Sequence, residues 1–384
     1  MHAVEDVVIV AARRTPQGRF LGALAGLSPV DLACAAAEAA LEPVGVAAID
    51  QVILGNVLSA GHGMNVARQV GVRLGIDVRV PAFTVNMMCG SGLQAIRLAA
   101  QAIRAGEATA VLCGGTESMS NAAYLLPRVR RGLKLGDAAV VDSLLADGLV
   151  DAFDRRHMGL QVEDLAADYR IGRAAQDAWA AESQRRHAAA AAAKAFAAEI
   201  VPVAGLAADE HPRPETTVAD LAGLNAAFRA DGSVTAGNSS GINDGAAVVV
   251  LAARAAAERA NWPVLCRWID SVAVGCPPQR MGLGPVHALQ TLAERRGCAV
   301  ADLGEFEINE AFAAQVLACI ADLGLDHGRV NPHGGAIAVG HPIGASGGRL
   351  VVHAAQRIAG GGCRRAAAAL CVGGGMGVAC LLER

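Results

Sequence analysis

Short apolar runs alternate with longer helix-like segments along the first third of the chain, and this alternation limits the possible folds most strongly. Strand-like runs at residues 7–11, 51–54, 83–86 and 109–113 are separated by helix-like segments at 29–41, 65–74 and 93–105. Such alternation is typical of α/β layers around a largely buried sheet. In the last helix-like segment, Leu93, Ile96 and Ile103 share one face, and Gly106 follows as a terminator. The sequence therefore predicts an α/β fold.

Composition excludes several classes of protein. Hydrophobic residues make up 53% of the 384 residues and charged residues 18%, which excludes a disordered chain. The net charge of -3 gives no basic field for nucleic acid, and the longest charge-free stretch near the end, 366–382, is interrupted by three glycines. The ten scattered cysteines contain no Cys-x-x-Cys pair, so we expect reduced thiols. We expect a cytoplasmic protein without nucleic-acid or membrane partners.

The middle of the chain differs from both ends. Residues 119–242 are richer in charge, and they hold a long helical pattern at 174–196 and a proline-bearing loop at 211–214. Strand signals return at 246–251 and 264–274. The order turn, helix, strand and glycine turn occurs once around Cys89–Gly115 and again around Ala345–Gly374. These features predict two similar α/β units with an inserted segment.

Four turns, three of them rich in glycine, each carry a reactive or polar side chain: Cys89, Asn309, His341 and Cys371. Cys89 lies between a strand and the first turn of a helix, where we expect a lowered thiol pKa and an approachable sulfur. Asn309 follows the end of a strand, where α/β sheets bind ligands. The imidazole of His341 lies on a glycine-rich loop from which it can reach a ligand, and histidine is the usual general base near neutral pH. Taken one at a time, each has a plain structural alternative: a packed core thiol for the cysteines, a helix N-cap for Asn309 and a structural role for His341.

Other kinds of site are less well supported. A Cys-Cys-His metal site is the obvious competitor, but no pair has close zinc-ligand spacing, so we expect no metal. No Gly-x-Gly-x-x-Gly follows the first strand, and the P-loop pattern is absent. Arg13 and Arg14 have no evident chemistry and are expected on the surface.

In these motifs the sequence resembles the thiolase family over essentially its whole length. The similar segments are Val10–Pro16, Gly114–Ser120 and Thr235–Ala246, together with the four turns in the family's order. The resemblance implies a five-layer α-β-α-β-α fold made of two similar βαβαβαββ halves plus an inserted loop domain. The implied domains are residues 1–118 with 243–264, an insertion at 119–242 for CoA binding and oligomer contacts, and 265–384.

The resemblance also implies roles for the turns. Cys89 matches the acylated nucleophile, His341 the base that activates it, and Cys371 the acid/base thiol for the second substrate. Asn309 matches the residue that positions a water, which forms one oxyanion hole with His341. The backbone amides of Cys89 and Gly373 match the second oxyanion hole.

Residues of the substrate channel are implied in the same way. They are His157 and Met158 beside the pantetheine and acyl group, Ser240 at the pantetheine amide, Arg213 near the adenine nucleotide, Phe228 in the loop before the Asp-Gly turn, and Met281 and Phe312 in the acyl pocket. The sequence departs from the family where many members read Lys-Leu-x-Pro-x-Phe. Here residues 223–228 read Gly-Leu-Asn-Ala-Ala-Phe; the lysine and proline are absent, so the resemblance does not carry over the CoA-nucleotide contact at this place.

The implied activity is reversible condensation of two acetyl-CoA to acetoacetyl-CoA plus CoA through an S-acyl-cysteine. Two alternatives stay open: a broader degradative 3-oxoacyl-CoA thiolase, and a non-catalytic protein that binds CoA, lipid or a metal. The implied partners are acyl-CoA substrates and further copies of the chain, as a homodimer or homotetramer. No cofactor is expected beyond the CoA thioesters, and fatty acid metabolism is the expected setting.

Overall fold

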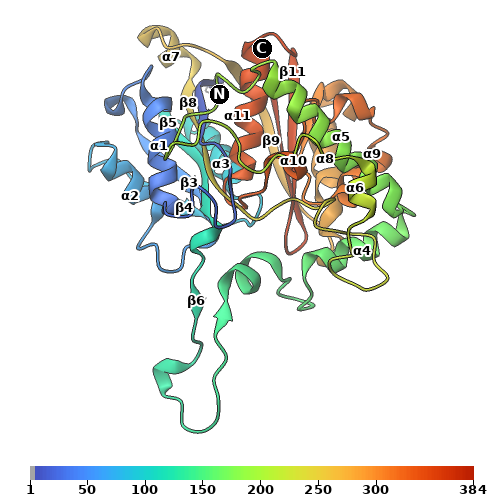
Figure 1. The fold of residues 1–384 in the computed structure, drawn as a ribbon. Coiled ribbons are helices and arrows are strands. Elements are labelled where there is room, and N and C mark those ends of the chain that lie inside the picture. Colours follow the sequence, from blue (N-terminus) through green and yellow to red (C-terminus); the bar gives the residue numbers. More distant parts are fainter. Residues whose placement is uncertain (1–4) are drawn as a thin grey trace.

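The computed structural model describes residues 5–384, and it is built around one continuous sheet of ten strands (Figure 1). Residues 1–4, at the start of the predicted first half, lie outside the described part. The strands of the first half are β1 (Val7–Arg14), β2 (Gly18–Arg19), β3 (Gln51–Gly55), β4 (Ala82–Val85), β5 (Ala110–Ser118) and β8 (Asn243–Ala253). Those of the second half are β9 (Cys266–Gly275), β10 (Glu305–Ile308), β11 (Arg365–Val372) and β12 (Met376–Glu383).

The two halves repeat one strand order. The first reads β4-β3-β5-β8-β1 and the second reads β10-β11-β12-β9, and antiparallel pairing of β1 with β9 joins them. In both halves the early pairs are parallel and the later pairs antiparallel. The strand that would match β4 in the second half is reduced to one parallel bridge between Phe306 and Val330. Asn331, in the left-handed region at φ 48°, and then Pro332 end that strand at once.

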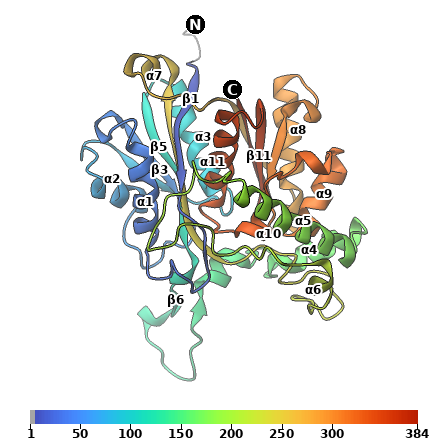
Figure 2. The ribbon, with the colours of Figure 1, turned by 45° about the horizontal axis from the view of Figure 1, so that its top comes forward.

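Helices complete five layers. In the outer layer of the first half, α1 (Pro29–Leu41) and α2 (Val66–Arg73) pack on β1, β3, β5 and β8. In the outer layer of the second half, α8 (Gly284–Arg296) and α9 (Ala313–Leu323) pack on β9 to β12. The middle layer is α3 (Ser91–Arg104) and α11 (Ser346–Ala359), which lie between the two halves of the sheet (Figure 2). The five-layer α/β prediction is confirmed.

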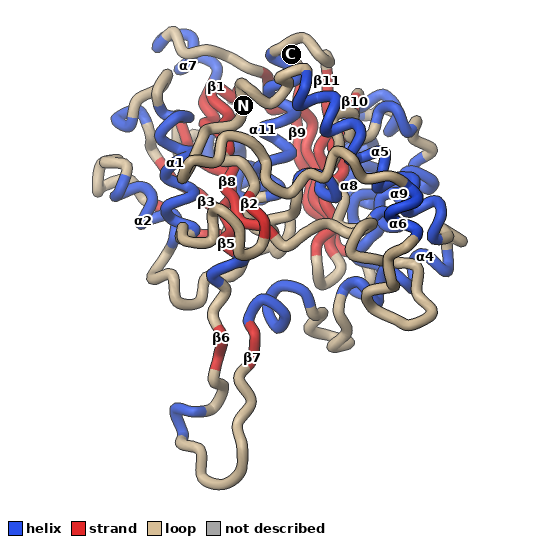
Figure 3. The backbone as a smooth tube through the Cα atoms, viewed as in Figure 1, coloured by secondary structure: helices blue, strands red, loops and turns tan. Residues whose placement is uncertain are grey.

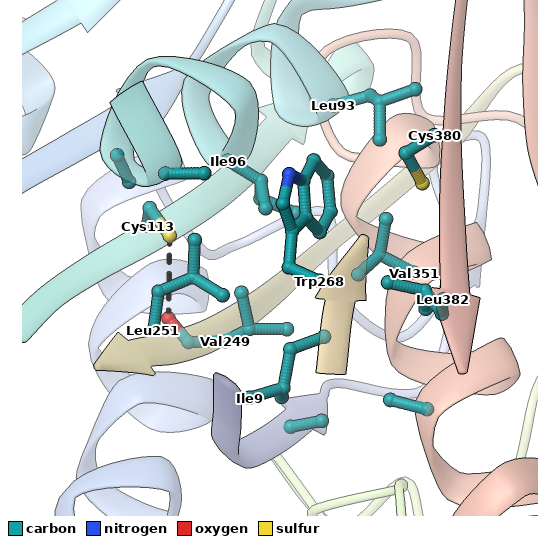
Figure 4. Close-up of a cluster of buried hydrophobic side chains, with 14 of the residues drawn as sticks. Ile9, Leu93, Ile96, Cys113, Val249, Leu251, Trp268, Val351, Cys380 and Leu382 are labelled. Carbon is teal, nitrogen blue, oxygen red and sulfur yellow. Dashed lines mark hydrogen bonds between the residues drawn. The ribbon is translucent and has the colours of Figure 1, made fainter. Parts of the chain in front are cut away.

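The middle layer is held by a buried apolar cluster. Figure 4 shows Trp268 of β9 lying among Ile9, Ile96 and Val351, so strands of both halves meet both central helices there. Trp268 is 1% exposed, and full burial of one large side chain contributes roughly 1.5–3 kcal/mol. The predicted helix at 93–105 is confirmed as α3, and Gly106 follows it at φ 75° as a helix terminator does.

The inserted segment begins after β5 and returns to the sheet at β8. It contains α4 (Met158–Asp168), α5 (Arg173–Ala192), α6 (Val218–Ala222) and a hairpin of β6 (Tyr124–Leu125) with β7 (Val141–Asp142). The predicted helix at 174–196 is α5, which ends four residues earlier at Ala192. The hairpin projects away from the body as an arm that is mostly loop (Figure 3). We call residues 122–143 the arm.

Arg14 corrects the expectation that the early arginines lie on the surface. Its side chain is 1% exposed and forms ion pairs with Glu199 at 2.8 Å and Asp209 at 2.6 Å. Both carboxylates belong to the inserted segment, so this buried cluster fixes that segment to β1. A buried arginine of this kind requires paired charges, which the chain supplies from positions far away in sequence.

Within residues 5–384, no helix is both long enough and apolar enough to cross a membrane.

Candidate active site

The four predicted turns meet around one cavity of about 430 Å³. Cys89, His341, Cys371 and Gly373 line it, and so do all the predicted substrate residues: His157, Met158, Arg213, Phe228, Ser240, Met281 and Phe312. Asn309 is the one predicted site residue outside the lining, and it reaches the site through His341. Residues more than 280 positions apart in sequence are therefore assembled at one place by the fold.

The crossing of the two central helices brings Cys89 and His341 together. A Cβ atom added to Gly92 in α3 would lie 2.7 Å from the backbone nitrogen of Gly348 in α11. Only glycine permits the backbones to approach so closely. Because Cys89 and His341 lie in the turns just before these helices, the crossing places the two side chains at the same cavity.

Cys89 lies in a strained turn. Met88, directly before it, has φ 47°, a conformation that is unusual for a bulky residue and is often found at functional sites. The hydroxyl of Ser91 secures this turn: Oγ accepts from the Met87 N–H at 2.8 Å and donates to the Met88 carbonyl at 2.6 Å. The turn therefore holds the sulfur in a fixed place between β4 and α3.

Burial, not the helix N-terminus, dominates the electrostatics of Cys89. The side chain is 4% exposed, and burial raises the pKa of the thiol to about 11. The backbone N–H groups of Gly373 and of Cys89 itself lower the pKa, but they do not offset the loss of water. The expected lowering of the Cys89 pKa was wrong. At neutral pH the sulfur is a thiol and needs a base.

His341 is a neutral imidazole held on several sides. Its Nδ1 lies 2.6 Å from Ser346 Oγ, its Nε2 lies 3.4 Å from Asn309 Nδ2, and its backbone N–H donates to Asn243 Oδ1 at 3.0 Å. Burial, followed by the positive charge of Arg349, lowers the pKa of His341 to about 3. A neutral imidazole that lines the same cavity as a neutral thiol can accept the thiol proton and so act as a base.

Asn309 follows β10 but does not cap a helix. α9 begins at Ala313 with Phe312 as its N-cap, so the plain alternative of a helix cap does not hold. The side chain of Asn331 fixes the end of the strand: Oδ1 accepts from the Ile308 N–H at 2.9 Å and Nδ2 donates to the Ile308 carbonyl at 2.8 Å. Asn309 is fully buried, and its amide is directed to His341.

Cys371 and Gly373 belong to the tight hairpin between β11 and β12. Gly374 and Gly375 have φ of 85° and 84°, which allows the strands to reverse within a few residues. Cys371 is 2% exposed, and burial, followed by the proximity of Cys89, raises its pKa well above the usual range. Gly373 presents its backbone N–H to the Cys89 sulfur. Two thiols and one amide donor thus share one side of the cavity.

The remaining lining forms a channel with aromatic and apolar walls. The rings of His157 and Phe228 stack with centroids 4.6 Å apart, and Phe312 meets Phe228 edge-on at 6.0 Å. Met158 and Met281 are buried and pack in the same apolar cluster as Cys371. Arg213 is the exposed cation among the lining residues. The departure at 223–228 begins at Gly223, which ends α6 and is exposed.

Sequence reasoning missed several residues of the site. Ser91 and Ser346 lie in the repeated turns but received no role: the Ser91 hydroxyl contacts Met88, next to Cys89, and the Ser346 hydroxyl contacts His341. Glu117 is fully buried and accepts from the backbone N–H groups of Val57, Leu58 and Gly344, which links the His341 loop to the first half. His211 also lines the cavity, with a pKa lowered to about 4 by burial and then by Arg213. Of these residues, only the two serines could have been found from the sequence, because they occupy matching positions in its two repeated turns.

Among residues 5–384, no group of three or more His, Cys, Asp or Glu side chains is arranged to hold a metal ion.

Comparisons with known proteins identify the family of the chain. The family model described as thiolase, N-terminal domain matches residues 7–255, and thiolase, C-terminal domain matches 262–384. The chain is 48% identical to acetyl-CoA acetyltransferase of Pseudomonas aeruginosa, over 99% of this chain and 100% of that one. It is 48% identical to a probable acetyl-CoA acetyltransferase of Escherichia coli, again over 99% and 100%.

Solved structures are also similar. The human mitochondrial 3-ketoacyl-CoA thiolase in complex with CoA superposes with a TM-score of 0.97 at 41% identity, covering 99% of this chain and 98% of that one. The Bacillus anthracis acetyl-CoA acetyltransferase gives a TM-score of 0.97 at 38% identity, with 100% of both chains covered. The fold and the paired thiols define a two-half α/β protein built for thiol chemistry. The chain belongs to the thiolase family.

Proposed function

We propose that the protein joins two acetyl-CoA molecules to give acetoacetyl-CoA and CoA, and also catalyses the reverse thiolysis. One observation carries the proposal: a single cavity is lined by two thiols, Cys89 and Cys371, together with neutral His341 and the amide of Gly373. Carbon–carbon bond formation between two acyl groups needs one group to carry the acyl and another to take the α-proton. One thiol cannot do both at once.

The first half-reaction loads the enzyme. His341 Nε2 takes the proton of the Cys89 thiol, and the sulfur attacks the carbonyl carbon of the first acetyl-CoA. The bond to the CoA sulfur then breaks, and Cys371 gives that sulfur a proton. CoA leaves, Cys89 holds the acetyl group, Cys371 is a thiolate and His341 carries the proton it received.

The second half-reaction uses the thiolate so formed. Cys371 removes an α-proton from a second acetyl-CoA, and the resulting enolate attacks the acetyl carbonyl on Cys89. The bond to the Cys89 sulfur breaks, and His341 returns its proton to that sulfur. Acetoacetyl-CoA leaves and all three side chains are back in their starting states.

Two sets of donors support the charge that develops on oxygen. The Gly373 amide already points at the Cys89 sulfur, so it and the Cys89 amide are placed for the oxyanion at the acetyl carbon. His341 and the buried side chain of Asn309 form the other set, and Asn309 Oδ1 has no partner among the described residues and is available to a water. One such donor is typically worth about 10²–10³ in rate.

The channel fits a CoA thioester. Its stacked rings, His157 and Phe228, offer an apolar wall for pantetheine, while Met158, Met281 and Phe312 enclose the short acyl end. Ser240 and exposed Arg213 provide a polar contact and a cation for the nucleotide phosphates. The relatives named acetyl-CoA acetyltransferase, at 43–48% identity, favour a two-carbon acyl donor.

We extend the proposal to assembly and setting. β4 is an edge strand with Phe83 38% exposed, directly before the nucleophile turn, and the arm carries exposed Leu135 at 100%. Both surfaces suit contacts with further copies of the chain, as a homodimer through β4 and a homotetramer through the arm. The proposed domains are a first half at 1–118 with 243–264, an inserted domain at 119–242 and a second half at 265–384. We also propose that the protein is cytoplasmic, acts in fatty acid metabolism and uses CoA thioesters without another cofactor.

A steady-state thiolysis series tests the substrate. Acetoacetyl-CoA, 3-oxohexanoyl-CoA and 3-oxodecanoyl-CoA are compared at saturating CoA, with kcat/KM measured for each. We expect acetoacetyl-CoA to be preferred at least ~10-fold, since each methylene that does not fit is worth roughly 1–3 kcal/mol. Equal or rising kcat/KM along the series would instead favour the broader degradative thiolase. No cleavage of any member would refute the activity.

A further inference from the structure

We propose that Ser346 is a positioning residue that holds His341 in the tautomer with hydrogen on Nδ1 and a lone pair on Nε2. The tautomer is a property of the folded chain. Its catalytic consequence rests on the function proposed above, because Nε2 is the atom that receives the Cys89 proton.

The hydroxyl of Ser346 has one proton to give. Oγ donates it to the Pro342 carbonyl at 2.9 Å and lies 2.6 Å from His341 Nδ1. With its proton engaged, the oxygen can only accept at Nδ1, so Nδ1 carries the hydrogen. Ser346 is fully buried, and water does not compete for this contact.

The contact at the opposite edge of the ring favours the same tautomer. Asn309 Nδ2 lies 3.4 Å from His341 Nε2, and an amide nitrogen is a donor only. A hydrogen on Nε2 would set two donors against each other in a buried place, which costs free energy. Contacts from two different elements therefore agree on where the proton sits.

The internal repeat of the fold supports a common role for two serines. Ser91 and Ser346 are the first residues of the two central helices, α3 and α11. Each hydroxyl turns back over the loop before its helix: Ser91 onto Met87 and Met88 beside the nucleophile, and Ser346 onto His341 and Pro342. The two halves thus use one serine position to fix the nucleophile in one case and the base in the other.

This arrangement gives the base its direction. The lone pair on Nε2 faces the side of the ring that holds Asn309, and His341 and Cys89 line the same cavity. When Nε2 takes the thiol proton, the resulting imidazolium still has the Ser346 oxygen as the acceptor for its Nδ1–H. Without that acceptor, the ring can place its single hydrogen on Nε2, and it is then no base for Cys89.

Nitrogen NMR of the wild-type protein tests the tautomer directly. The full-length protein is labelled with ¹⁵N at histidine only, and the His341 signals are identified by their absence in His341→Gln. At neutral pH we expect a protonated Nδ1 and an unprotonated Nε2 in the substrate-free protein. A protonated Nε2 with bare Nδ1 would overturn the proposal, whatever the activity of the enzyme.

Variants test the role of the hydroxyl. Ser346→Ala should give a mixed or reversed tautomer and slow single-turnover acylation by about 10-fold, the effect of one lost buried hydrogen bond. The control is Ser118→Ala, which also removes a buried hydroxyl that donates to a carbonyl, that of Leu27 at 2.9 Å, and should leave the His341 signals unchanged. Unchanged His341 signals in Ser346→Ala would also overturn the proposal. Absence of acylation in the wild type would refute the proposed function but leave the tautomer result standing.

Discussion

Cys89 and His341 form a pair in which neither side chain is charged before substrate binds. Burial raises the pKa of Cys89 to about 11 and lowers that of His341 to about 3, so the proton stays on sulfur. The thiolate therefore forms only as the reaction proceeds, with His341 as acceptor. A thiolate–imidazolium pair in the resting enzyme is disfavoured, because both side chains are buried away from water.

The pH dependence of acylation follows from these shifts. His341 must be neutral to act as a base, and a folded-state pKa near 3 means that activity is lost only as the pH falls far below the usual histidine range. We expect kcat/KM for acylation to stay level from about pH 8 down to about pH 5, since this quantity reports the free enzyme. Stopped-flow acylation across that range is the measurement. A fall centred near pH 6.5 would show that His341 titrates normally.

Cys371 is expected to act in the second half-reaction more than in the first. In Cys371→Ser a far less acidic hydroxyl replaces the thiol, so it is a poor base for the α-proton. Condensation should fall at least ~100-fold, while an acetyl group should still be found on Cys89. Condensation is followed by acetoacetyl-CoA release and loading by mass spectrometry. Normal condensation in this variant would remove Cys371 from the mechanism.

Single residues divide into those that the sequence predicted and those that it did not. Cys89, His341 and Cys371 stand in glycine-rich turns that can be found by inspection, and the cavity contains all three. Asn243 and Glu117 could not be assigned, because their importance lies in partners distant in sequence, His341 and Gly344. The upward shift of the Cys89 pKa could not be predicted either, because it comes from burial, which a sequence motif does not show.

The helices α3 and α11 are more than core-filling elements. Their crossing at Gly92 and Gly348 sets the distance between the nucleophile turn and the base turn. Helix periodicity predicts which face of α3 is apolar, and that prediction holds for Leu93, Ile96 and Ile103. It does not predict which other helix lies against Gly92, because that contact joins the two halves.

Gly92→Ala should therefore disturb both stability and chemistry. The added methyl group would lie 2.7 Å from the Gly348 nitrogen, so the helices must separate. We expect a loss of about 1–3 kcal/mol in the free energy of unfolding, the usual cost of overpacking, and slower acylation. Urea denaturation and acetyl loading are the two measurements. Gly106→Ala is the control for acylation: Gly106 lies beyond the opposite, C-terminal end of α3 with open space around it, so this variant should lose some stability through its φ of 75° but leave acylation unchanged. If Gly92→Ala kept wild-type stability and wild-type acetylation of Cys89, that would contradict the close contact of α3 with α11.

At the scale of the whole molecule, an arm projects from a body made of two similar halves. The arm's exposed side chains include Tyr124, Leu126, Leu133 and Leu135, each at least 49% exposed. Single helices and strands of the halves follow from sequence patterns, but the arm does not, since residues 126–140 carry no strong periodicity. In the proposed tetramer, this apolar surface contacts another copy of the chain.

Removal of the arm tests this assembly. Leu125 and Val141 pair across the hairpin, so residues 126–140 can be replaced by an Asn-Gly turn. We expect native mass spectrometry to show a tetramer for the full chain and a dimer for the shortened one, with acylation of Cys89 retained. A full chain that is already dimeric would contradict this role of the arm.

The proposed mechanism requires the acetyl group to pass through Cys89, and a single-turnover labelling experiment can follow that transfer. The protein is loaded with ¹³C-acetyl-CoA, freed of CoA and divided into two samples. Peptide mapping of one sample should find the labelled acetyl group on Cys89. Unlabelled acetyl-CoA added to the other should release acetoacetyl-CoA with the label only in its terminal two carbons. A label on Cys371 alone, or product without label in those carbons, would contradict the account.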